Sequence, residues 1–367
     1  MTTRNDREFM ALALKLAERG RYRTSPNPMV GAVIARGNHK ISTGYHRQVG
    51  GDHAEIVAFK NATTSVLGAT LYVTLEPCCH TGRTGPCTKA IIKAGIKRVV
   101  VATKDPNPLV NGKGIKELRK AGITVETGLM RAEAVRINES YFGYYRNGSP
   151  YIVLKMAQSL DGRIATKSGD SHWISSAPSL KLVHQLRAEY DGIIVGMGTV
   201  MADNPSLTVR RVKGKNPYRI VLTSSMKFPR KCHLLQDNAD YKTIIAGPGE
   251  ATERFAGTKQ GRDLIFWHIK RKSNGRLDII DLVRQAGKFG LRSLLIEGGQ
   301  QVATEFLRAN LVDKCIFILS PILLGKGINA IGDLKTSLIA DALSFEKYEF
   351  SPLGKDCVFV GYPRRRV

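Results

Sequence analysis

The segment LEPCCHTGRTGPC, residues 75–87, holds three of the six cysteines of the chain and follows His-Ala-Glu at residues 53–55. One imidazole and two thiolates form a ligand set typical of catalytic zinc sites, in which a fourth position stays open for water. His53, Cys78 and Cys87 match that set. The pattern therefore predicts a zinc site held between a strand and a helix of an α/β domain.

Glu55 is the predicted catalytic residue. In the first turn of a helix that begins near His53, it would lie beside the metal without binding it. Zinc lowers the pKa of water to near ~7, which makes hydroxide available for attack on an amidine-like ring carbon. Glu55 would then protonate the ring nitrogen and the departing amine. Cys87 opens the next predicted helix, where exposed N–H groups favour a thiolate.

Two alternatives remain open for this cluster. His53 and Glu55 could form a solvated helix start, with the cysteines acting as small buried apolar residues. The cluster could also be a closed, non-catalytic zinc site, which would need a fourth protein ligand such as Cys79 or His80. Both thiols would come from rigid positions after a strand and before a helix, which favours the catalytic zinc site.

Hydrophobic periodicity around this cluster predicts alternating strands and helices. A helix is expected over 6–19, a hairpin over 30–35 and 40–46, and later strands over 69–75 and 97–103 that should be parallel. Asn-Gly and a proline in residues 146–150 indicate a boundary. We therefore predict one domain over residues 1–147 and a second over residues 148–367.

The second domain repeats the alternation with buried strands over 151–157, 191–196, 293–297 and 314–321. Gly298 and Gly299 separate a strand from a helix, so they predict a seat for phosphate at the helix start. The Gly-x-Gly after the strand over 191–196 lacks a third glycine and is only a weak dinucleotide signature.

The composition describes a globular α/β protein of 367 residues, long enough for two hydrophobic cores. The net charge of +25 divides into +12 for residues 1–150 and +13 for the rest, so no half is a basic arm. Such a dispersed charge suits small anions better than RNA. The clustered cysteines indicate metal or core thiols in a reducing, cytoplasmic setting, and no stretch is long enough to span a membrane.

The motifs together resemble the bifunctional deaminase/reductases of riboflavin biosynthesis. In the first domain the resemblance covers SPNPMVGAVI (25–34), GYH (44–46), HAE, TLEPC (74–78), the eight-residue spacing from Cys78 to Cys87 and KDPNP (104–108). It implies a cytidine-deaminase-like three-layer α/β/α domain in which Asn27, His46, Arg83 and Asn107 contact the substrate. Gly85 stands where the family usually has a proline.

In the second domain the resemblance covers KMAQSLDGRIA (155–165), HWIS (172–175), residues 186–210, IEGG and SPILLG. It implies a dihydrofolate-reductase-like α/β domain that binds NADPH. Thr223 stands where the family commonly has an aspartate. The implied substrate contacts are Lys155, Ser171, Arg187, Leu207, Arg210 and Glu297. The implied cofactor contacts are Ala157, Trp173, Thr199, Asp203, Ser224, Gly298, Gly299, Gln300, Gln301, Val302, Ala303, Thr304 and Glu305.

The resemblance implies two reactions on one small pyrimidine ribose phosphate. The first is zinc-dependent deamination of 2,5-diamino-6-(5-phosphoribosylamino)pyrimidin-4(3H)-one. The second is reduction of the ribosyl group of the deaminated product by NADPH. It also implies a homo-oligomer, dimer or tetramer, without nucleic-acid or membrane partners. A nucleic-acid deaminase whose second domain binds RNA is the competing enzyme class, and it predicts strongly salt-dependent RNA binding.

Overall fold

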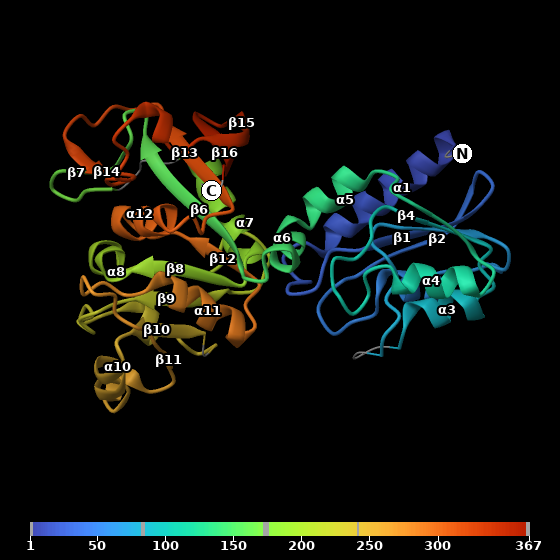
Figure 1. Cartoon of the computed structure of the whole chain (residues 1–367), viewed down its shortest axis with the longest axis horizontal. Helices are drawn as coiled ribbons and strands as arrows, with labels where there is room; N and C mark the ends of the chain where they lie inside the picture. Colours follow the sequence, from blue (N-terminus) through green and yellow to red (C-terminus); the bar gives the residue numbers. More distant parts are fainter. Residues whose placement is uncertain (1–2, 82–84, 172–175, 241, 365–367) are drawn as a thin grey trace. The chain divides into compact units, whose positions relative to one another are not determined.

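The computed structural model describes residues 3–81, 85–171, 176–240 and 242–364. The chain divides into two compact units, Met1–Gly148 and Ser149–Val367, and each is an α/β unit with its own sheet (Figure 1). Gly148 ends the last helix of the first unit with a positive φ of 65°, a conformation that favours glycine.

The first unit is built on a five-stranded sheet in the order β2-β1-β3-β4-β5. As predicted, β1 and β2 form an antiparallel hairpin, and β3, β4 and β5 run parallel. The strands are β1 Gly31–Arg36, β2 His39–Tyr45, β3 Thr70–Val73, β4 Arg98–Val101 and β5 Thr124–Thr127. The helices are α1 Arg4–Ala17, α2 Ala54–Lys60, α3 Cys87–Lys93, α4 Lys113–Lys120, α5 Arg131–Ile137 and α6 Glu139–Asn147.

Helices cover both faces of this sheet. One face packs against α2, α3 and α4 through residues such as Ala58, Ile91 and Leu118. The other packs against α1 and α5 through Met10 and Ile137. Alternate residues of the buried strands β3 and β4 point to the two faces, which explains why both strands are mainly apolar.

The second unit has a nine-stranded sheet in the order β11-β10-β9-β8-β12-β6-β13-β16-β15. Its strands are β6 Tyr151–Ser159, β8 Gly192–Gly196, β9 Tyr218–Leu222, β10 Thr243–Gly247, β11 Ile265–His268, β12 Ser293–Ile296, β13 Lys314–Ser320, β15 Phe345–Leu353 and β16 Asp356–Pro363. The helices are α7 Ala177–Glu189, α8 Met197–Asp203, α9 His233–Gln236, α10 Gly249–Ala256, α11 Ile279–Phe289 and α12 Gln300–Arg308. A separate pair joins β7 Arg163–Thr166 to β14 Gly327–Asn329.

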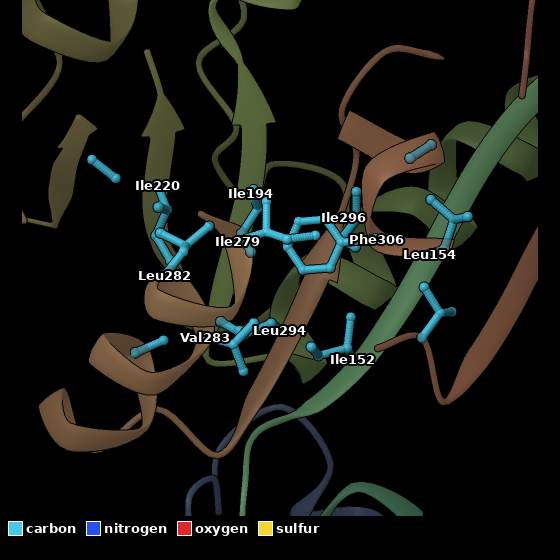
Figure 2. Packing of buried hydrophobic residues seen from close by; sticks show 14 of the residues in the cluster. Ile152, Leu154, Ile194, Ile220, Ile279, Leu282, Val283, Leu294, Ile296 and Phe306 are labelled. Atoms are coloured by element: carbon cyan, nitrogen blue, oxygen red, sulfur yellow. The ribbon is translucent and has the colours of Figure 1, made fainter. Parts of the chain in front are cut away.

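Two apolar clusters hold this sheet between helices. Figure 2 shows α11 residues Ile279, Leu282 and Val283 against strand side chains, with Phe306 of α12 in the same cluster. The opposite face packs against α7 and α8 through Leu186 and Val200. Both predicted layers of helices are therefore present, and the parallel strands are buried between them.

The C-terminal hairpin β15–β16 was not expected from the sequence. Its strand β16 pairs antiparallel with β13, and β15 forms the edge of the sheet. Nearly all of β15 is exposed, so it lacks the apolar alternation by which a half-buried strand is recognised. Within the described ranges, no helix combines the length and apolar character needed to cross a membrane.

Candidate active sites

The predicted zinc ligands meet in the first unit. His53 caps the N-terminus of α2, Cys87 is the first residue of α3, and Cys78 lies in the loop after β3. His53 Nδ1 is 3.2 Å from Cys87 Sγ and 3.4 Å from Cys78 Sγ, and all three donor atoms lie within 4.8 Å of one another. Donors at zinc-bond lengths from one tetrahedral ion would be separated by about 3.5 Å. The donor set and its geometry therefore fit zinc.

Local backbone packing sets the position of His53. A Cβ on Gly44 in β2 would lie only 2.2 Å from the carbonyl oxygen of Ala54. Glycine at this position lets the start of α2 rest directly on the hairpin. The neighbouring segment Tyr45–His46 then lies beside the metal ligands, with the His46 and His53 rings 5.6 Å apart and edge-to-face.

The two thiols are not equivalent. Hydrogen bonds from Cys87 and His53 hold the pKa of the Cys78 thiol at about 4. One of these bonds comes from the backbone N–H of Cys87, 3.4 Å from Cys78 Sγ, at the start of α3. The lowered pKa favours the thiolate, the form that binds metal.

Glu55 lies in the first turn of α2 and is 3% exposed. Its carboxyl is not one of the three clustered donors. Burial raises the pKa of Glu55. A raised pKa suits a group that must both accept and return a proton near neutral pH.

A closed zinc site would need a fourth protein ligand. Among the residues that the structure describes, the cluster contains only His53, Cys78 and Cys87. The Cys79 thiol instead lies 3.9 Å from the carbonyl oxygen of Leu109. Three ligands leave one position of a tetrahedron open, which is the arrangement of catalytic zinc sites.

Two of the predicted substrate contacts also meet here. Asn27 Nδ2 is 3.3 Å from His46 Nε2, and His46 Nδ1 is 3.0 Å from the carbonyl oxygen of Asp52. Asn107 accepts a hydrogen bond from the Leu109 backbone N–H through its Oδ1 at 3.0 Å. Arg83 lies outside the described residues.

The sequence reading missed Glu76, which organises the loop carrying Asn107. Its buried carboxylate accepts from the backbone N–H groups of Asp105, Gly112 and Ile115 at 2.8–3.2 Å. Glu76 stands two residues before Cys78, inside the quoted TLEPC motif, so one segment supplies both a predicted metal ligand and the anchor of the Asn107 loop. In the sequence, only the Glu76-Pro77 pair indicated a special role for this carboxylate.

In the second unit, the candidate residues gather at the carboxyl ends of parallel strands. Thr199 follows β8, Ser224 follows β9, and Gly298 and Gly299 follow β12, while Ala157 lies near the end of β6. The strand order reverses around β12 and β6, and ligands of open α/β sheets bind at such a point. The topology thus places these residues where a cofactor site is expected.

A buried charge cluster lies beside this edge. Arg187 and Glu297 form two parallel hydrogen bonds of 2.8 Å, with side chains 12% and 7% exposed. Burial raises the pKa of Glu297, but Arg187 and Lys155 more than offset this and hold it lowered. Burial lowers the pKa of Lys155, and the charge of Glu297 opposes that shift.

The segment that carries Leu207 and Arg210 is held by three side chains. Arg187 reaches the Thr208 carbonyl oxygen at 3.5 Å, Asn216 accepts from Val209 N–H, and His184 Nδ1 accepts from Arg210 N–H. Leu207 is buried with a φ of 53°, an uncommon conformation for a branched side chain. His184 was missed, although it precedes Arg187 by three positions and so shares its helix face.

The start of α12 forms the predicted glycine junction. Gly299 caps the helix and donates to Thr199 Oγ1 at 3.0 Å. A Cβ on Gly298 would lie 2.9 Å from Val302 Cβ, so this glycine permits close packing of helix on strand. The first-turn N–H groups of a helix are suited to bind phosphate.

Not every residue predicted along α12 is turned toward a ligand. Ala303 is fully buried in the core. The Thr304 hydroxyl bonds the Gln300 carbonyl oxygen and the Gly332 N–H, while Glu305 pairs with Arg276 and Arg308. The side chains of these three residues are therefore engaged within the protein.

The remaining predicted residues lie near the same edge or outside the described part. Ser171 Oγ is 3.4 Å from Asp203 Oδ1, which joins two of them. The Thr223 hydroxyl accepts from the N–H groups of Ser225 and Met226, so it fixes the turn next to Ser224. Trp173 lies outside the described residues.

Comparison with known proteins extends these findings to the whole chain. The RibD C-terminal domain matches residues 150–359, and the zinc-binding region of cytidine and deoxycytidylate deaminases matches residues 3–103. The riboflavin biosynthesis protein RibD of Aquifex aeolicus (strain VF5) is 40% identical over 354 residues, covering 96% of this chain and 97% of that relative. The chain belongs to the RibD family. The RibD of Escherichia coli (strain K12) is 39% identical over 369 residues, covering 96% and 97% of the two chains.

Solved RibD structures match over the same extent. A form of Acinetobacter baumannii RibD has a TM-score of 0.86 at 35% identity, covering 98% of this chain and 99% of that one. The deaminase/reductase of Thermotoga maritima has a TM-score of 0.84 at 33% identity with the same coverage. The predicted fold class and the bifunctional enzyme class are confirmed. The chain is a riboflavin biosynthesis enzyme with a zinc-dependent deaminase domain and an NADPH-dependent reductase domain.

Proposed function

We propose that the two domains act in turn on one pyrimidine ribose phosphate. The first removes an amine by hydrolysis from 2,5-diamino-6-(5-phosphoribosylamino)pyrimidin-4(3H)-one. The second reduces the ribosyl group of 5-amino-6-(5-phosphoribosylamino)uracil to ribityl. The Thermotoga maritima relative is described as a deaminase and reductase of such compounds. The observation that carries the proposal is the cluster of His53, Cys78 and Cys87 beside the uncoordinated carboxyl of Glu55.

In the deaminase domain, Glu55 moves the protons. Zinc, when bound by His53, Cys78 and Cys87, supplies an activated water at neutral pH. Glu55 takes a proton from the attacking water and delivers protons to the ring nitrogen and the departing amine. Its burial keeps bulk water from competing for these protons. Ammonia leaves as the second product.

The deaminase substrate contacts remain the predicted set. Asn27 and Asn107 offer amides that suit the edges of a pyrimidinone ring, and Arg83 offers a cation for the phosphate. His46 lies between Asn27 and the metal ligands, with hydrogen-bonding partners at both ring nitrogens. This placement suits a residue that orients the ring over the metal site.

In the reductase domain, the proposed phosphate contacts come from α7 and from the segment that it holds. Arg187 and Arg210 would hold the phosphate, with Ser171, Leu207 and Glu297 lining the same site. NADPH, when bound, supplies the hydride that reduces the anomeric carbon. Lys155 and Asp203 would orient the sugar as its ring opens.

The cofactor contacts follow the carboxyl edge of the sheet. We place the NADPH phosphates at the start of α12, where Gly298 and Gly299 leave room for close approach. Ala303, Thr304 and Glu305 would then contribute through the helix backbone, since their side chains are engaged elsewhere. The other proposed contacts are Ala157, Trp173, Thr199, Asp203, Ser224, Gln300, Gln301 and Val302.

One assay of the purified chain tests both steps. The diaminopyrimidinone phosphate is added first without NADPH, and ammonia is measured. NADPH is added next, and loss of its absorbance is followed. We expect about one equivalent of each per substrate. Ammonia release that requires NADPH, or NADPH oxidation without prior ammonia release, would contradict the proposed order.

We also propose a domain boundary between residues 147 and 148 and a homo-oligomeric state, a dimer or tetramer. The edge strand β15 exposes Phe350, and the nearby loop exposes Leu338 and Ile339. Exposed apolar groups on a sheet edge favour self-association. Light scattering after size exclusion tests this, and Phe350→Lys should lower the mass if the edge is the interface.

A reducing compartment, the cytoplasm, suits an enzyme whose metal ligands are free thiols. The charge of the chain is better explained by its phosphate-bearing substrate and cofactor than by nucleic acid. If the chain does bind RNA, its affinity should fall steeply with added salt.

A further inference from the structure

The deaminase domain ends in two short helices, α5 and α6, that join at Asn138. This segment lies beyond residues 3–103, which carry the zinc-binding region, and none of its residues belongs to the metal cluster. Two of its buried polar side chains, Asn138 and Tyr141, nevertheless reach the two loops that carry the proposed substrate amides.

Asn138 holds the loop of Asn27. Its Oδ1 accepts from the Met29 N–H at 2.7 Å, and its Nδ2 donates to the Met29 carbonyl oxygen at 2.8 Å. Pro26 and Pro28 flank Asn27 and have no N–H to donate. These prolines reduce the number of backbone N–H groups that can hold the loop. Asn138 binds both the N–H and the carbonyl oxygen of Met29, which follows Pro28.

This use of Asn138 is informative because it stands at a helix start, where asparagine usually caps the helix. Its side chain forms no cap with α6. The amide is spent instead on a residue 109 positions away in the sequence. A purely local role at the helix junction does not account for that arrangement.

Tyr141 holds the loop of Asn107. Its hydroxyl donates to Asp105 Oδ1 at 2.9 Å, and the same oxygen accepts from the Asn107 N–H at 2.9 Å. Asp105 is 6% exposed, and its own N–H is bound by Glu76. Tyr141 thus fixes the carboxylate that fixes the backbone of Asn107.

Asn138 and Tyr141 are three residues apart, a spacing that places them on the same side of a helical turn. We propose that the α5–α6 junction is a positioning element of the deaminase site, which holds Asn27 and Asn107 at the separation that the pyrimidinone ring requires. Asn138 and Tyr141 act through these loops and do not touch the reacting atoms. This inference rests on the proposed deamination.

The test uses the full-length zinc-loaded enzyme with Tyr141→Phe and Asn138→Ala, and with both together. Tyr218→Phe in β9 of the second unit is the matched control for loss of a tyrosine hydroxyl. Ammonia release from the diaminopyrimidinone phosphate gives kcat and KM. Zinc content and reduction of pre-deaminated substrate are measured on the same samples.

We expect Tyr141→Phe and Asn138→Ala each to raise the deaminase KM by roughly tenfold, with a smaller change in kcat. Zinc content and reductase activity should match those of the control. The double variant should raise KM further. A merely structural role would lower thermal stability while leaving KM unchanged.

Three outcomes are distinguishable. A raised KM with zinc retained supports the positioning role. An unchanged KM overturns it, whatever happens to stability, and so does a loss of zinc and kcat at constant KM. If the unaltered enzyme releases no ammonia from this substrate, the proposed function fails first.

Discussion

The two candidate sites differ in how their charges are balanced. In the deaminase domain, two thiols and an imidazole converge as ligands for a metal ion. In the reductase domain, Arg187 and Glu297 already satisfy each other through paired hydrogen bonds. The first site needs an ion from solution to balance its ligands, whereas the Arg187–Glu297 pair of the second is formed within the protein.

Because of this difference, the two sites affect the folding stability of their domains in different ways. Converging donors without metal destabilise the apo form, so metal binding contributes folding free energy. A buried ion pair needs no ion from solution, but removing either partner lowers stability because it leaves an uncompensated buried charge. The deaminase domain should respond to metal supply and the reductase domain to substitution within its own pair.

The largest expected effect is on deaminase activity. Glu55→Gln keeps the size and polarity of the side chain but removes the group that transfers protons. We expect ammonia release to fall by about 10³-fold or more, with zinc content unchanged. Reduction of pre-deaminated substrate should stay near the level of the unaltered enzyme. Loss of both activities would show that the two sites are not independent.

Next is the charge pair of the reductase domain. Arg187→Met leaves Glu297 buried without its partner, which should cost about 3–5 kcal/mol of unfolding free energy. Both tryptophans of the chain, Trp173 and Trp267, belong to the second unit, so tryptophan fluorescence during urea unfolding reports that unit. Glu297→Met added to Arg187→Met should recover part of the loss. Equal stability of the single and double variants would contradict the argument.

Metal removal should act on the other domain. Chelation of an enzyme held at a hundredfold excess of zinc over its Kd should lower stability of the deaminase unit by about 2.7 kcal/mol. The tryptophan-monitored transition of the reductase unit should not move. Re-addition of zinc should restore the stability of the deaminase unit. A shift in the tryptophan signal on chelation would argue against separate responses.

The smallest effect is a pH dependence of the reductase unit. Burial lowers the pKa of His184 from 6.5 to about 4, with Arg187 adding to the shift. The unfolded chain therefore binds a proton that the folded chain excludes. The stabilisation is complete above pH 6.5 and is lost as the pH falls toward 4.

His184→Asn tests this dependence, because its amide oxygen can still accept from the Arg210 N–H but does not titrate in this range. The variant should lose the slope between pH 4 and 6.5 in urea unfolding followed by tryptophan fluorescence. An unchanged slope would assign it to other groups.

The sequence predicted the metal cluster well because its ligands sit at element ends that short motifs specify. His53 precedes a helix and Cys87 begins one, so their positions follow from local structure. The parallel strands were also predictable, since burial on both faces makes them continuously apolar. These features depend on residues close together in the chain.

What the sequence did not reveal depends on long-range pairs. Glu76 binds backbone groups up to 39 residues away, and Asn138 binds Met29 across 109. A polar residue has no periodic pattern that indicates its partner, so such contacts appear only once the fold brings them together. The exposed strand β15 was missed for a related reason, because nothing buried one face of it.

Glu76 has one more consequence. Glu76 holds the loop that should bind the pyrimidinone, and Cys78, two residues later, is a ligand that should bind the metal ion. Because only one residue separates Glu76 from Cys78, a displacement of Cys78 on metal binding should also displace the loop of Asn107. Enzyme without zinc should therefore bind its substrate weakly, so that the substrate stays available to zinc-bound molecules.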